Sequence, residues 1–241
     1  MSVSNMPESS NEWSTRWTIA FVGVALIVAL IGLGVLPAIL GYSPVGLIRQ
    51  ALDGLFAASS VQAMWYVTRA AGIISYLLLW LSTAWGLAVS NKILDPVLPR
   101  AITYDFHQFL SLLAIGFVIL HVGVLLADQY LPFSVAQILV PFAAPYRPVW
   151  VGIGTIGLYL ALLVSITFYL RKWIGQKTFR VIHLASYLAF SAAALHGLFA
   201  GTDSPLPTVQ AMYLLTTLSV VFLTVYRIVT SRRLRRQSIA A

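Results

Sequence analysis

Long apolar runs separated by short polar connections dominate the chain. A helix needs about 20 mostly apolar residues to cross a bilayer. Six runs are long enough, at about 17–40, 68–90, 104–127, 149–170, 181–200 and 209–230. The runs are continuous rather than alternating, which argues against a β-barrel. The pattern predicts an all-α membrane protein built as a bundle of six transmembrane helices.

The segments between and beyond these runs indicate the domain organisation. The first run exceeds the roughly 7–15 apolar residues of a signal peptide, so we interpret it as a membrane span. We expect a short N-terminal segment (1–16), one helical domain (17–230) and a basic tail (231–241). The longest connections, at about 41–67 and 128–148, are apolar and rich in proline and aromatic residues, and we predict that they cover the bundle as a lid.

Composition narrows the class of protein. Hydrophobic residues make up 59% of the chain and charged residues only 9%, and the mean hydropathy is +0.87. Soluble domains carry roughly 25% charged residues. These values exclude a soluble globular protein, a disordered chain and a nucleic-acid-binding domain. The absence of cysteine excludes disulfides, cysteine-ligated iron–sulfur clusters, thiolate-bound zinc and covalently attached haem.

The distribution of lysine and arginine predicts the orientation in the membrane. With the N-terminus inside, 12 of these 15 residues lie on the cytoplasmic side. Such an asymmetry follows the positive-inside rule. We therefore expect an integral membrane protein with both termini in the cytoplasm, in the lipid bilayer of a prokaryotic cytoplasmic membrane.

All four histidines lie on the third and fifth predicted helices, two on each. His121 follows His107 at position i+14, and His196 follows His183 at position i+13. At about 1.5 Å per residue these spacings span about 21 and 19.5 Å along a helix. Each helix therefore carries one histidine near each face of the membrane. Ionisable side chains inside a bilayer are costly and indicate a functional site.

Because the third and fifth helices run in the same direction, the histidines form two pairs at matching depths, with the pair of His107 and His183 toward the cytoplasm. Two imidazoles at one depth can bind one haem iron from opposite sides, and helical bundles commonly house such cofactors. A single four-histidine metal site is excluded, because ligands about 20 Å apart on one helix cannot meet. Histidines that only join helices by hydrogen bonds, and a proton relay, stay open as alternatives.

The angular positions of the histidines agree with this pairing on one helix only. At about 100° per residue, His107 and His121 differ by about 40° and share a face, whereas His183 and His196 differ by about 220°. We therefore expect either a local distortion of the fifth helix or two haems placed at different positions around it.

These spacings resemble those of the ferric reductase-like transmembrane domain family, which includes ferric reductases and NADPH oxidases. That family has six helices and two b-type haems, held by histidine pairs spaced as they are here. His196-Gly197 resembles the end of its fifth helix and Thr68-Arg69-Ala70-Ala71-Gly72 the start of its second, so the likeness covers about residues 65–230. The resemblance implies two haem b groups bound by all four histidines, with Arg69 near the outer haem.

Two residues near the predicted haem sites, Arg69 and Phe190, each allow two interpretations. Arg69 suits a bidentate, charge-assisted bond to a haem propionate, or it is an interfacial arginine that reaches the lipid headgroups. Phe190 lies about midway along the sequence between His183 and His196. It is either an aromatic bridge between two haems or a packing residue.

Members of the family continue into a cytoplasmic flavin and nicotinamide module, for which the short soluble segments here have no room. We therefore expect no flavin or NAD(P) site, and a separate flavoprotein dehydrogenase or a quinol as donor. The function expected is that of a dihaem b-type membrane cytochrome, an oxidoreductase component that passes electrons to an external acceptor. The alternatives are a quinol-linked dihaem cytochrome b subunit and a haem-bearing structural subunit of a larger electron-transfer assembly. Familiar quinol-oxidising cytochromes use the i+14 spacing in both pairs, which counts against the first.

Overall fold

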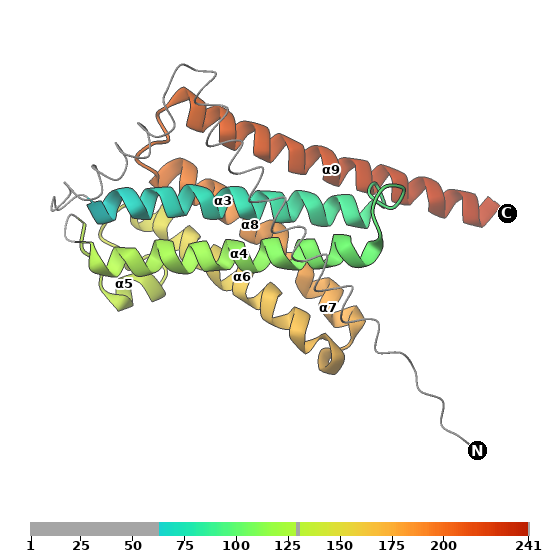
Figure 1. Ribbon diagram of the computed structural model, residues 1–241, viewed down its shortest axis with the longest axis horizontal. Coiled ribbons are helices and arrows are strands. Elements are labelled where there is room, and N and C mark those ends of the chain that lie inside the picture. The colour runs from blue at the N-terminus through green and yellow to red at the C-terminus, as the bar shows by residue number, and fades with distance from the viewer. Residues whose placement is uncertain (1–62, 129–130, 241) are drawn as a thin grey trace.

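A computed structural model describes residues 63–128 and 131–240 (Figure 1). In this part of the chain the secondary structure is helical, and five helices are long and apolar enough to cross a membrane. The helices, in chain order, are α3 (Ala63–Ser90), α4 (Arg100–Ala127), the short α5 (Val135–Leu139), α6 (Pro148–Ile174), α7 (Gln176–His183), α8 (Ala185–Ala200) and α9 (Pro207–Ala240). Helices α7 and α8 together make one span.

These spans confirm five of the six predicted membrane helices. All five begin earlier than predicted, and the difference is largest for α3, α4 and α7, which start at Ala63, Arg100 and Gln176. Helix α9 continues to Ala240, so the predicted tail from 231 onward is a helical extension. The predicted N-terminal segment, the predicted span at 17–40 and most of the connection at 41–67 lie outside the described residues.

Local sequence signals account for where α6 begins and ends. Pro148 occupies its first turn, where the missing N–H costs nothing and the fixed φ favours the helix, and Arg147 before it is left-handed with φ of 42°. Gly175 ends the helix with φ of 81°, a conformation that favours glycine. The chain can therefore reverse at this single glycine, and α7 starts at once.

The helices form a bundle in which successive connections lie at opposite ends. Helix α3 packs on α4, α6 packs on α8, and α9 packs on α3. The α3–α4 connection, the turn between α6 and α7 and the end of α9 lie at one end of the bundle, and α5 lies at the other (Figure 1). Large apolar side chains such as Leu188, Leu215 and Phe222 are exposed, as expected for a surface that faces lipid.

The connection between α4 and α6 folds over the end of the bundle. Phe133, Ile138 and Ala144 are buried there and pack against Val122 of α4 and Val151 of α6. The described part of this connection therefore forms the lid that the sequence predicted for 128–148.

The arrangement of the ends predicts a cysteine-labelling pattern, and the chain contains no native cysteine. Single substitutions Lys92→Cys and Lys177→Cys mark one end of the bundle, and Ser134→Cys and Thr202→Cys mark the other. With a membrane-impermeant maleimide on intact cells, we expect labelling of the second pair only, and of the first pair after permeabilisation. Labelling of one member of each pair from the same side would contradict the topology.

Candidate functional site

The fifth span is interrupted directly after His183. Leu184 separates α7 from α8. Its N–H donates to the carbonyl of Val181, and the N–H of Tyr187 donates to the carbonyl of Leu184, each at 3.2 Å. This three-residue spacing is tighter than that of an α-helix. The local distortion expected from the i+13 spacing is therefore present, and it lies at the histidine itself.

The structure brings the four histidines together in the pairs that the depths predicted. The ring centres of His107 and His183 lie 6.1 Å apart. Those of His121 and His196 lie 6.3 Å apart. Both pairs have their ring planes at 76° to each other. Each pair joins α4 to the fifth span, so the bundle holds two similar sites at two depths.

The distance within each pair suits two imidazoles that bind one metal ion from opposite sides. A metal–nitrogen bond to histidine is about 2.0–2.1 Å, and a ring nitrogen lies about 1.1 Å from its ring centre, so the two centres lie about 6.3 Å apart. The observed 6.1 and 6.3 Å agree with this value. In haem the porphyrin supplies the remaining iron ligands, so one pair of axial histidines is sufficient.

Hydrogen bonds in the outer pair leave the metal-binding nitrogens available. His121 Nδ1 lies 2.8 Å from the carbonyl oxygen of Thr68, and His196 Nδ1 lies 2.9 Å from that of Trp150. A carbonyl oxygen only accepts, so both Nδ1 atoms carry the proton and donate it. The lone pair then resides on Nε2, which is the tautomer and orientation typical of a metal-bound histidine.

The inner pair is held differently. His107 Nδ1 lies 3.3 Å from the hydroxyl oxygen of Ser82, which also bonds to Ser111 at 2.8 Å. His183 Nδ1 is buried and has no hydrogen-bond partner among the described residues. Its ring centre lies 5.3 Å from that of Phe179, which is one helical turn earlier. The inner site therefore depends more on packing and less on hydrogen bonds than the outer one.

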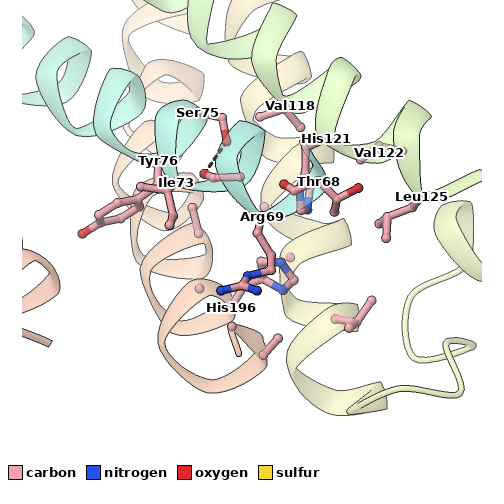
Figure 2. Close-up of a pocket in the computed structure, with 18 of the residues that line it drawn as sticks. Thr68, Arg69, Ile73, Ser75, Tyr76, Val118, His121, Val122, Leu125 and His196 are labelled. Carbon is pink, nitrogen blue, oxygen red and sulfur yellow. Dashed lines mark hydrogen bonds between the residues drawn. The ribbon is translucent and has the colours of Figure 1, made fainter. Parts of the chain in front are cut away.

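An apolar cavity of about 210 Å³ contains the outer histidines. Figure 2 shows His121 from α4 and His196 from α8 in this pocket, with Arg69 of α3 reaching into it. Phe133 and Ile138 of the lid contribute to its lining. A cavity with apolar walls and a few polar groups is typical of a cofactor site, so the residues present here fit a haem.

Arg69 forms an ion pair that could not be foreseen from the sequence. Its Nε donates to Asp203 at 2.8 Å, and its Nη2 bonds to the second carboxylate oxygen. Asp203 belongs to the connection between α8 and α9, and both side chains line the cavity. Arg69 is thus at the place expected for a propionate partner, although its contact here is Asp203, and propionate binding stays a prediction.

Phe190 lies in an aromatic cluster between α3, α8 and α9. It is 3% exposed and stacks on Tyr76, with ring centres 5.9 Å apart. Tyr76 in turn contacts Tyr213 at 4.6 Å and bonds through its hydroxyl to Thr216 at 2.5 Å. Packing therefore accounts for its burial, and a role as bridge between two haems stays a prediction.

Three glycines lie beside the histidine rings, and their contacts with these rings were not predicted from the sequence. Gly72 and Gly86 of α3 face His121 and His107, and Gly154 of α6 faces His196. A signal was present, because Gly86 follows Gly72 at position i+14, the same spacing as the histidines that they face. The carbonyl acceptors of Thr68 and Trp150 have no such signal, since any residue can supply a carbonyl.

Comparisons with protein-family models, with curated proteins and with solved structures found no match to this chain. The fold and the site define the class of protein as a helical membrane protein with two pairs of facing histidines.

The ion pair at the cavity predicts a specific loss of stability. The side chains of Arg69 and Asp203 are only 29% and 21% exposed, so Asp203→Asn should lower the free energy of unfolding by about 1–2 kcal/mol. Thermal unfolding in detergent measures the change. Asp95→Asn is the matched control, because it removes a pair to Arg100, whose side chain is 59% exposed. A melting temperature of Asp203→Asn no lower than that of Asp95→Asn would contradict this prediction.

Proposed function

We propose that the chain is a dihaem b-type membrane cytochrome that passes electrons singly across the bilayer. The observation that carries the proposal is the presence of two facing histidine pairs, with ring centres 6.1 and 6.3 Å apart, on the same two membrane-spanning segments. Two sites stacked along one bundle offer a route across the membrane, whereas one site would serve a single side.

The chain's own residues would hold and orient the two groups. His121 and His196 would be the ligands of the outer haem, and His107 and His183 those of the inner haem. When bound, the haem irons would supply one-electron redox chemistry. Apolar walls and the lid line the outer site, and Arg69 supplies a positive charge to which a propionate can bind.

The end of the bundle opposite the lid suits an electron donor from the cytoplasm. Arg171, Lys172 and Lys177 are exposed there, around the turn between α6 and α7. A basic surface attracts an acidic protein and speeds its encounter. We therefore propose a separate flavoprotein dehydrogenase or a quinol as donor and an acceptor on the opposite side, in agreement with the positive-inside rule.

The proposal predicts two haem b groups per chain, which acid acetone should extract because the chain contains no cysteine. The single variants His121→Ala and His196→Ala should each lose one haem, and their combination should lose no more than one. The combination of His107→Ala with His196→Ala should lose both. Haem quantitation and reduced-minus-oxidised spectra measure the outcome. Wild-type protein with fewer than two haems would rule out the dihaem function.

A second prediction concerns the donor. NADPH alone should leave the purified chain oxidised, whereas dithionite should reduce both haems. With a protein donor, the rate should fall as ionic strength rises, because salt screens the attraction between charged surfaces. Neutralising the basic cluster of the tail (Arg232, Arg233, Arg235 and Arg236) should slow the reaction at low salt. Direct reduction by NADPH, with no flavin present, would contradict the need for a separate donor.

A further inference from the structure

Three glycines lie against three of the four histidine rings. A Cβ added at Gly72 would lie 3.0 Å from His121 Nδ1, and one at Gly154 would lie 2.6 Å from His196 Nδ1. A Cβ at Gly86 would lie 2.9 Å from His107 Cε1. These distances are below ordinary van der Waals contact. Any side chain at the three positions would therefore displace an imidazole.

Each glycine also stands at position i+4 from the residue that accepts from its histidine. The acceptor of His121 is the carbonyl of Thr68, one helical turn before Gly72. The same offset relates the carbonyl of Trp150 to Gly154. It also relates Ser82, whose hydroxyl contacts His107, to Gly86. The offset is thus the same on two helices and at both depths.

Helix geometry explains this offset for the two carbonyl acceptors, those of Thr68 and Trp150. In an α-helix the carbonyl of one residue lies beside the side chain of the residue four positions later, which is why serine and threonine can bond back to it. Glycine at the later position has no Cβ to cover that carbonyl. A neighbouring imidazole can then reach the second lone pair of the oxygen while the helical hydrogen bond stays in place.

Ordinary helix packing does not account for these three glycines. Small residues often let membrane helices approach closely, and Gly157 is such a case, because an added Cβ there would meet Cβ of Ala192 at 3.0 Å. At Gly72, Gly86 and Gly154 the nearest atoms belong to a histidine ring instead. A contact with the ring, rather than with a neighbouring backbone, is therefore what these positions have in common.

We propose that Gly72, Gly86 and Gly154 are positioning residues that open the helix surface to the Nδ1–H of an opposing histidine. The contact fixes the tautomer and turns Nε2 toward the partner histidine. This inference rests on the proposed function, in which Nε2 binds the haem iron. It assigns two such glycines to the outer site and one to the inner site.

His183 has no corresponding glycine on α6. Moving along α6 from Gly154 by the interval that separates the two histidines of the fifth span leads to Thr167. Thr167 is buried and donates its hydroxyl to the carbonyl of Val164 at 2.9 Å. The ring of His183 is held instead by Phe179 and by the interruption of the helix at Leu184.

Glycine-to-alanine variants of the full chain test the proposal. Gly72→Ala and Gly154→Ala should weaken the same haem, and Gly86→Ala the other, with a loss of haem affinity of about 10- to 100-fold. Where the haem is retained, its midpoint potential should shift, because an imidazole without the Nδ1–H hydrogen bond donates less electron density to the iron. Gly116→Ala and Gly123→Ala are matched controls on α4, since an added Cβ there meets nothing within 4 Å.

The outcomes separate the two proposals. Fewer than two haems in the wild-type chain would overturn the proposed function. Two haems in the wild type, together with unchanged haem content and potentials in all three glycine variants, would overturn only the positioning role.

Rescue of a cavity variant tests the hydrogen bond itself, even if the alanine variants fail to fold. His121→Gly removes one outer ligand, and free imidazole should restore the outer haem spectrum by binding the metal and donating its N–H to the carbonyl of Thr68. The probe 1-methylimidazole has no N–H. Rescue by this compound should require about ten times the concentration of imidazole, or should leave the midpoint potential of the outer haem shifted. Equal rescue by both compounds, at the same potential, would overturn the proposal.

Discussion

A hydrogen bond from a buried imidazole to a carbonyl of the neighbouring helix is the contact on which the arrangement of this bundle depends. Within a membrane an unsatisfied polar group costs several kcal/mol, so an acceptor for the N–H of a buried imidazole stabilises the bundle. His121 finds it on α3 and His196 on α6. The two bonds link α4 to α3 and α8 to α6 at the depth of the outer pair.

The fifth span has to meet a second requirement, which is to present two histidines to one straight neighbour. On α4 the i+14 spacing keeps both rings on one face. The i+13 spacing on the fifth span would turn them apart, and the tighter turn at Leu184 reduces the angle between them. At the inner site, next to this interruption, His183 Nδ1 has no hydrogen-bond partner within the described part of the chain. The two sites are therefore similar in the distance between their histidine rings but differ in the hydrogen bonds that hold these rings.

The two ends of the bundle are built for different surroundings. At the end near the outer histidines, residues of the lid and the Arg69–Asp203 pair line the cavity. At the other end, exposed basic side chains surround the turn between α6 and α7. In the proposed cytochrome this difference gives each side its own task, since one side attracts a donor and the other shields a buried site. The same features would serve a quinol-linked protein less well, because a basic surface attracts an acidic partner.

The sequence alone determined the helical class, the five spans that the structure describes and the pairing of the histidines by depth. These properties depend on hydrophobic run length and on the rise per residue, which are local. It also predicted that the fifth span would be distorted if both rings faced one neighbour. Only the tertiary structure decided which carbonyls accept from the imidazoles, which glycines make room for them and that Asp203 holds Arg69. Those contacts join residues from different segments of the chain, up to 134 positions apart, and backbone acceptors leave no trace in the identity of a side chain.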